Sequence, residues 1–289
     1  MTGIGVARIL SLLDARTPFC LVTVVASGSD SALHVGGKIA VFPDGTSEGR
    51  VGSDRLTRAI LDFSLRFLGA EEPGQVRFTV DGAELANRRR MRDREVAPDT
   101  VELLFEPCLP PPRLVIVGAG HIAVPLCALG AVLDYEVTVI DDRARFATRE
   151  RFPGAHAILV DDFSRAVESL EITPWTYLVL VTRGHEHDEA TLQRVAGSPA
   201  RYIGMIGSKR RVLVVFDRLK RAGVDETLLS KVYAPIGLDL GGRAPTEIAL
   251  AIMAEIVNVR RRGGAKSLAR FIHSEVGLAD PGADVADEA

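Results

Sequence analysis

Residues 114–126 read LVIVGAGHIAVPL, a run that predicts a strand, a glycine-rich turn and the start of a helix. An apolar, strand-like run ends at Gly118, and Gly118, Gly120 and Ala123 follow the spacing of a nucleotide-binding fingerprint that opens a helix. In such a loop the first glycine permits a tight turn and the second lets a pyrophosphate approach the backbone. The small Ala123 allows close packing of helix on strand. Free N–H groups at the helix start favour an anion.

The acidic residue that completes this fingerprint is expected about twenty residues further on, at the end of the second strand. Asp141 and Asp142 end the apolar run EVTVI at that place. A carboxylate there bonds a ribose 2′-hydroxyl and repels a 2′-phosphate, which favours NAD over NADP. Arg143 and Arg145 weaken that preference, because either could turn towards a phosphate. A Rossmann-like fold that binds no dinucleotide stays open.

Around the fingerprint, the pattern divides the chain into two domains. Residues 1–110 mix helical and strand-like segments, which predicts a smaller α+β domain. The prolines of CLPPPR at 108–113 are typical of a linker. From 111 to 275 strands and helices alternate, which predicts a Rossmann-type α/β domain with a parallel sheet. Residues 276–289 are acidic and small, and we expect them to be disordered.

The individual elements follow from hydrophobic periodicity and turn residues. In the first domain we expect helices at 5–15 and 54–69 and strands at 19–27, 36–45, 75–80 and 100–107. In the second we expect strands at 113–117, 136–140, 156–160, 176–182 and 200–204. Helices are expected to begin near residues 121, 162, 187 and 208, with a last helix at 244–262.

Composition and charge exclude several classes of protein. The 289 residues carry a formal net charge of −3, which argues against bulk nucleic-acid or anionic-membrane binding. The basic run RRRMRDR at 88–94 is interpreted as a solvated surface. No apolar stretch is long enough to span a bilayer, and the start lacks the pattern of a signal peptide, so we expect a cytoplasmic protein. Cys20, Cys108 and Cys127 are widely spaced and are expected to be reduced thiols.

Several polar loops should meet at one edge, because ligands of such sheets lie at the carboxyl ends of the strands. The fourth strand delivers TRGHEHD at 182–188, and the fifth delivers GSKRR at 207–211. Ser208 is placed to cap a helix, and the basic residues beside it are placed to meet an anion. The further candidates for cofactor binding in these loops are Thr182, Gly207, Ser208, Lys209 and Arg210.

Three histidines fall on this predicted edge: His121, His185 and His187. We interpret the others, His34, His156 and His273, as structural. The catalytic candidates are His185, His187 and Asp188. A His-x-His followed by Asp could ligate zinc or iron, act as a general acid–base, or merely provide helix-start polarity. We expect His121, His185 and Asp188 to face one crevice, with Gly118, Gly120 and Asp141 on its other wall.

Five motifs in series give the sequence a family resemblance. They are VGAGHIAVPL, VTVIDDRARFATRERFP, VTRGHEHD, YIGMIGSKRR and PIGLDLGGRAPTEIALAIMAEIV. Together they resemble the xanthine dehydrogenase accessory family, also called XdhC/CoxI, over nearly all of 113–262. The amino-terminal portion is similar more loosely, through the strand before SGSDS and through GGKIAVFPDG.

The resemblance implies a cytoplasmic accessory protein that binds molybdenum cofactor, protects it during sulfuration and hands it to a molybdenum hydroxylase. It also implies a homodimer that meets a cysteine desulfurase and the hydroxylase apoenzyme. A pterin phosphate is an anion with a flat ring, so a Rossmann crevice could be reused for it. His121 would then supply a donor beside the phosphate that ordinary dinucleotide loops lack.

One departure from the family pattern keeps two alternatives open. Members of the family carry a Cys-Gly-Gly ahead of the strand that matches VELLFEP, whereas this sequence has RRRMRDREVAPDT there. If that thiol handles cofactor or sulfur, this chain has lost it, and Cys108 lies at the other end of the strand. A diverged NAD-dependent oxidoreductase is one alternative. A regulatory nucleotide sensor without chemistry is the other.

Overall fold

The structure is a computed structural model, and it describes residues 3–29, 33–85 and 97–265. The basic run at 88–94 and the tail at 276–289 therefore lie outside the described residues, as does His273.

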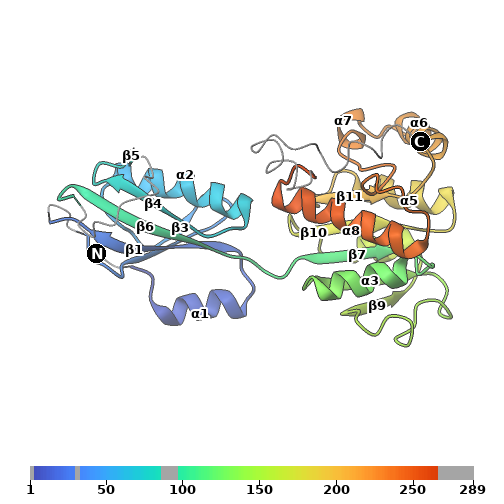
Figure 1. The fold of residues 1–289 in the computed structure, drawn as a ribbon, viewed down its shortest axis with the longest axis horizontal. Coiled ribbons are helices and arrows are strands. Elements are labelled where there is room, and N and C mark those ends of the chain that lie inside the picture. The colour runs from blue at the N-terminus through green and yellow to red at the C-terminus, as the bar shows by residue number, and fades with distance from the viewer. Residues whose placement is uncertain (1–2, 30–32, 86–96, 266–289) are drawn as a thin grey trace, which may run out of the picture. The chain divides into compact units, whose positions relative to one another are not determined.

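Two compact units make up the chain, Met1–Pro111 and Pro112–Ala289, and each is described by itself (Figure 1). The division falls inside the run of consecutive prolines, whose fixed φ angles and missing N–H groups keep that stretch out of both sheets.

The first unit is built on a six-stranded antiparallel sheet in the order β3-β2-β1-β6-β4-β5. Its strands are β1 (Phe19–Ser27), β2 (Lys38–Val41), β3 (Ser47–Glu48), β4 (Gly74–Thr79), β5 (Glu84–Leu85) and β6 (Thr100–Cys108). β1 and β6 form the centre of the sheet, and they pair from Phe19 opposite Cys108 to Ser27 opposite Val101.

Two helices, α1 (Val6–Asp14) and α2 (Asp54–Ala70), cover opposite faces of this sheet (Figure 1). Alternate residues of β1 point to opposite faces, so Phe19 packs with the α1 cluster and Cys20 with the α2 cluster. α2 continues through Gly69, where the sequence predicted its end. It stops before Glu71, which adopts the left-handed conformation with φ 56°.

The second unit contains a five-stranded parallel sheet in the order β11-β10-β7-β8-β9. Its strands are β7 (Arg113–Val117), β8 (Glu136–Asp141), β9 (Ala157–Val160), β10 (Thr176–Leu180) and β11 (Tyr202–Met205). The predicted Rossmann-type sheet is confirmed. The strand order reverses between β7 and β10, which makes this the switch point where such folds bind ligands.

Helices cover both faces of the parallel sheet, which is why its central strands are continuous apolar runs. α3 (Ala123–Val132) and α8 (Pro245–Arg261) pack on one face, whereas α4 (Phe163–Glu168), α5 (His185–Val195) and α6 (Lys209–Arg221) pack on the other. The short α7 (Glu226–Leu229) joins the second group. As predicted, α8 begins with a proline in its first turn and ends among arginines.

Element boundaries differ from the sequence expectations by a few residues. α3 begins two residues later than predicted, because residues 121–122 form a turn before it. α5 begins two residues earlier than predicted, because its N-cap is Gly184. The strand expected at 36–45 is limited to β2, because Gly36 turns the chain with φ 88° and residues 43–45 form the next turn.

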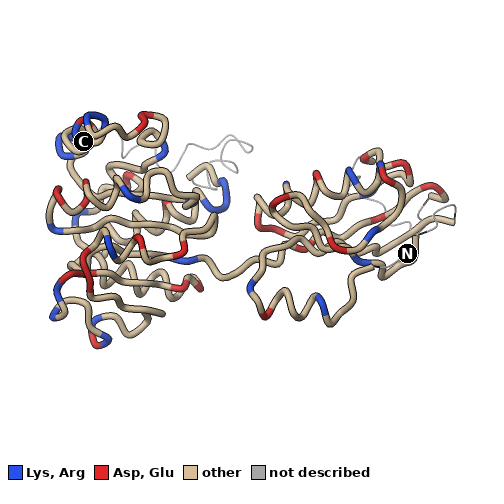
Figure 2. The backbone as a smooth tube through the Cα atoms, turned by 180° about the vertical axis from the view of Figure 1, so that it is seen from behind, with Lys and Arg blue, Asp and Glu red and all other residues tan. Residues whose placement is uncertain are grey.

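Basic and acidic residues are interspersed along both units (Figure 2). Among the described helices, none has the length and apolar character needed to cross a membrane. The three cysteines are free, and burial raises the pKa of the Cys20 thiol to about 12. The structure thus agrees with the expectation that the thiols form no disulfide.

Candidate functional site

The glycine-rich loop connects β7 to α3 at the switch point. Gly118 has a φ of 107°, and a Cβ on it would lie 2.6 Å from the carbonyl oxygen of Val181, just past the end of β10. Only glycine fits this turn, as the fingerprint predicted. Gly120 has nothing within 4 Å of the position that a Cβ would occupy, so the backbone there is open to a ligand.

The backbone N–H groups of this loop fall into two sets. Gly118 donates to Ile140 O at 2.8 Å, and Ala119 donates to Asp141 Oδ2 at 2.7 Å. Within the described chain, no acceptor bonds the N–H groups of the next three residues, Gly120, His121 and Ile122. Unbonded N–H groups at a helix start form a site that an anionic group could occupy.

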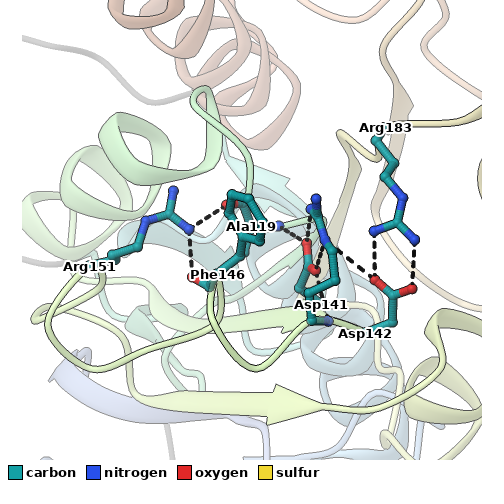
Figure 3. A network of polar contacts seen from close by, with 7 residues as sticks. Ala119, Asp141, Asp142, Phe146, Arg151 and Arg183 are labelled. Atoms are coloured by element: carbon teal, nitrogen blue, oxygen red, sulfur yellow. Dashed lines mark hydrogen bonds and ion pairs between the residues drawn. The ribbon is translucent and has the colours of Figure 1, made fainter.

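Asp141 is fully buried, and all its acceptor capacity is used by the protein (Figure 3). Oδ2 accepts the Ala119 N–H, Oδ1 accepts the Arg143 N–H at 3.0 Å, and the Arg143 guanidinium bonds both oxygens at 2.8 and 3.0 Å. A carboxylate offers about four lone-pair positions, so none remains for a ribose hydroxyl. This geometry argues against the ribose contact expected of Asp141.

The pKa of Asp141 reflects the same contacts. Burial by itself would raise the pKa, but the hydrogen bonds from Arg143 and from the Ala119 N–H outweigh it and hold the pKa below the ordinary aspartate value. The carboxylate is therefore a charged structural member of the loop.

A second arginine holds the other side of the same peptide. Arg151 Nη1 donates to Ala119 O at 2.8 Å and to Phe146 O at 2.6 Å (Figure 3). The Arg143 guanidinium carbon lies 3.9 Å from the centroid of the Phe146 ring. Ala119 is thus bonded at its N–H by Asp141 and at its carbonyl by Arg151, and the two bonds fix this peptide of the loop. Arg151 belongs to the motif VTVIDDRARFATRERFP, but the sequence did not indicate that it bonds the glycine-rich loop.

Asp142 and Arg183 join the loops that follow β8 and β10. The Arg183 guanidinium meets the Asp142 carboxylate with two bonds of 2.9 and 2.8 Å (Figure 3). β7 lies between these two strands, so the pair bridges the strands on either side of the glycine-rich loop. The sequence predicted Asp142 at this edge but carried no signal for Arg183 as its partner.

Asp188 does not face the crevice as expected. Its carboxylate is fully buried, accepts from the Thr182 hydroxyl and forms an ion pair with Arg211. Burial raises its pKa above the ordinary aspartate value, against the opposing effects of Thr182 and Arg211. As the helix-start alternative expected, Asp188 lies in the first turn of α5. It makes no capping hydrogen bond, because Gly184 is the N-cap and the Asp188 carboxylate bonds side chains. Asp188 ties the end of β10 to α6.

The edge histidines do not form one described cluster. His121 is exposed beside the glycine-rich loop, whereas the His187 ring packs edge-on against Phe163 with centroids 5.0 Å apart. His185 opens α5, and its side chain lies outside what the structure describes. Among the described residues, no group of three or more His, Cys, Asp or Glu side chains could hold a metal ion.

The loop that follows β11 lies further from the glycine-rich loop than the loops that follow β8 and β10. Ser208 caps α6 as predicted, since its hydroxyl accepts the Arg211 N–H at 3.3 Å, and Lys209 and Arg210 are exposed. Gly207 packs against the Arg211 side chain. β11 is two strands from β7, roughly 10 Å at the usual strand spacing. These residues therefore lie at the same edge of the sheet but away from the glycine-rich loop.

The fold and this loop define a Rossmann-type protein with unbonded backbone N–H groups at its switch point. Comparison with protein families then specifies it further. The profile described as the XdhC Rossmann domain matches residues 114–256, and that of the XdhC and CoxI family matches residues 12–79. Together the two matches span well over half of the chain. The chain belongs to the XdhC and CoxI family.

Curated relatives are similar over part of their length. The "Uncharacterized protein YqeB" of Escherichia coli K12 is 26% identical over 252 residues, which is 86% of this chain and 45% of the relative. A protein of Bacillus subtilis 168 that is named as a probable xanthine dehydrogenase component is 30% identical over 163 residues, 56% of this chain and 47% of the relative. The chain thus spans about half the length of these proteins.

Among solved structures, a crystal structure described as a xanthine dehydrogenase from Bacillus halodurans is 19% identical to this chain. The alignment covers 92% of this chain and 98% of that one, with a TM-score of 0.48.

Proposed function

We propose that this chain is an accessory protein for a molybdenum hydroxylase such as xanthine dehydrogenase, and that its second unit binds the pterin of the molybdenum cofactor. Membership of the XdhC and CoxI family supports the accessory role. The similarity to a protein named as a probable xanthine dehydrogenase component supports the choice of client.

The bonding of the Asp141 carboxylate is the observation that favours a pterin over NAD as the ligand. A dinucleotide site of this fold uses the acid at the end of the second strand to bond the adenosine ribose. Here that carboxylate is buried and saturated by Ala119 and Arg143. The loop keeps its phosphate-accepting N–H groups but lacks the ribose acceptor, which favours a pterin phosphate over NAD.

The residues that would hold the cofactor are those of the open half of the loop. The N–H groups of Gly120, His121 and Ile122 would bond the phosphate, and the exposed His121 imidazole would add a donor beside it. When bound in its client, the cofactor supplies the molybdenum centre for hydroxylation. This chain's part is to bind the pterin, orient it and release it to the hydroxylase, with a cysteine desulfurase as the partner for sulfuration and a homodimer as its assembly.

An activation assay tests the accessory role. Apo-hydroxylase is incubated with molybdenum cofactor in the presence of wild-type protein, Gly120→Ala or Arg221→Ala. Arg221 is exposed near the end of α6, away from the loop, so this variant is the matched control. Wild type and Arg221→Ala should raise the yield of active hydroxylase, whereas Gly120→Ala should not, because its methyl group occupies the space at the phosphate.

Two other outcomes identify the alternatives. Reduction of NAD by the purified chain with any substrate, without effect on the hydroxylase, would identify a diverged NAD-dependent oxidoreductase. Nucleotide binding without turnover or activation would identify a sensor.

A further inference from the structure

An apolar groove of about 470 Å³ lies along α8 on the second unit, away from the glycine-rich loop. Leu129 of α3 and Leu133, which caps the end of that helix, form one wall, and Leu250, Ala254 and Val257 of α8 form the other. Leu250 is 52% exposed and Leu133 is 41% exposed, which is unusual for two leucines that face one cavity.

α8 is apolar on two faces, and the sheet covers only one of them. Ala249, Ile252 and Ile256 are buried in the core beneath the helix. Leu250, Ala254 and Val257 follow one another at spacings of four and three residues, so they form a second face along the groove. A helix that is apolar on both sides is normally buried on both sides.

The chain itself turns into this groove at the end of α8. Arg262 ends the helix in the left-handed conformation, with φ 53°, and the Gly263 N–H donates to Asn258 O at 2.9 Å. This is the usual way for a chain to leave a helix. Gly263 and Ala265 then line the groove, and Ala265, at φ 51°, is the last described residue.

The residues that follow have the composition to fill an apolar groove. Residues 266–272 read KSLARFI, and three of these seven residues, Leu268, Phe271 and Ile272, are large and apolar. Seven extended residues reach roughly 23–25 Å. The distance along α8 from Arg261 back to Leu250 is about 16 Å at the helical rise per residue. The segment therefore starts at the groove and is long enough to cover it.

We propose that residues 266–272 of this chain dock into the groove between α3 and α8, with Leu268, Phe271 and Ile272 against Leu250 and Val257. The occupant is intramolecular, because the groove begins where the chain leaves the helix. Docking covers the second apolar face of α8 and fixes that helix on the sheet.

Four variants of the full chain test this by melting temperature. Truncation after Ala265 and the double change Leu268→Asp/Phe271→Asp should each lower the melting temperature by roughly 2–4 °C, the shift typical of losing one moderate packing contact in a chain of this size. Truncation after His273 keeps the segment, and Lys266→Asp/Arg270→Asp changes only its charged positions, so both should melt as wild type does. Equal melting temperatures in all four variants would overturn the proposal.

A coupling measurement separates docking from any indirect effect. Leu250→Ala should lower the melting temperature more in the full chain than in the chain truncated after Ala265, because contacting residues are not additive. Equal shifts in the two backgrounds would contradict contact between the segment and Leu250.

The alternative occupant is a second copy, and two measurements identify it. With Leu250→Cys/Phe271→Cys, a short thiol cross-linker should join the two positions within one chain, and light scattering should give the same number of chains per particle before and after truncation. Cross-links only between chains, or a change in the number of chains per particle on truncation, would assign the groove to a second copy and overturn the intramolecular proposal.

Discussion

The carboxylate of Asp141 accepts the backbone N–H of Ala119 at 2.7 Å, so the acid at the end of β8 bonds the protein's own glycine-rich loop. Arg143 completes the carboxylate's bonding, and Arg151 holds the carbonyl of the same peptide. The protein's own side chains therefore hold the shape of the loop.

Replacing Asp141 by Asn should destabilise the second unit. The amide keeps the size of the side chain but removes the charge and one acceptor, so a buried partner loses its bond. The loss should be roughly 1.5–3 kcal/mol in the free energy of unfolding, the range for hydrogen bonds to charged groups. Urea denaturation measures it. Asp217→Asn, at an exposed ion pair of α6, is the control and should change stability by less than about 1 kcal/mol. Equal losses in the two variants would rule out a structural role for Asp141.

The same pair of proteins should show a defined pH dependence. The native pKa of Asp141 is lowered by Arg143 and the Ala119 N–H against the effect of burial, so its ionised form stabilises the fold. That stabilisation is fully present above the ordinary aspartate pKa of about 3.9, and it is lost as the pH falls through the lower native pKa. The difference in urea midpoint between wild type and Asp141→Asn should be constant from pH 7 to pH 5 and should narrow below about pH 4. A difference that grows on acidification would be inconsistent with a lowered pKa.

The two loop glycines should respond differently to alanine. Gly118→Ala places a methyl group 2.6 Å from Val181 O at a positive φ, which should cost roughly 1–3 kcal/mol of stability. Gly120→Ala meets no atom within 4 Å and should leave the melting temperature close to that of wild type. Thermal denaturation of both variants makes the comparison. A Gly120→Ala protein as unstable as Gly118→Ala would show that the space at Gly120 is not open.

Arg151 should stabilise the glycine-rich loop, although it lies ten residues after Asp141. Arg151→Ala leaves the carbonyls of Ala119 and Phe146 without their donor, at a cost of roughly 1.5–3 kcal/mol. Arg151→Lys should recover part of this, because one ammonium group can donate to both oxygens. Arg165→Ala, at an exposed ion pair of α4, provides the comparison and should be nearly neutral. If Arg151→Lys is no more stable to unfolding than Arg151→Ala, the hydrogen bonds are not what stabilises the loop.

The parallel sheet could be predicted from sequence because its signals are local. RLVIV and EVTVI are continuous apolar runs between turn residues, and Gly118 marks the turn that only glycine permits. The order of the first unit's sheet could not be predicted in the same way. Its central pair, β1 and β6, joins segments about eighty residues apart, and nothing in either segment identifies the other.

The site was predicted in its residue types but not in its bonding. A carboxylate at the end of the second strand indicates a ribose contact only if no other donor captures it, and Arg143 does so from two residues away. Similarly, Asp188 near a helix start indicates capping, whereas its actual partner, Arg211, comes from the next helix of the fold. Such pairings depend on tertiary structure, which the periodicity of a sequence does not encode.

The most direct test of the proposed function is to identify the small molecule that this protein carries. Wild type, Gly120→Ala and Arg221→Ala are purified from a host that makes molybdenum cofactor. Each is then analysed for molybdenum, for oxidised pterin by fluorescence and for nicotinamide nucleotides by chromatography. We predict pterin in wild type and Arg221→Ala and its loss from Gly120→Ala, with no nicotinamide nucleotide in any sample. Bound nicotinamide nucleotide without pterin in the wild-type protein would contradict the assignment.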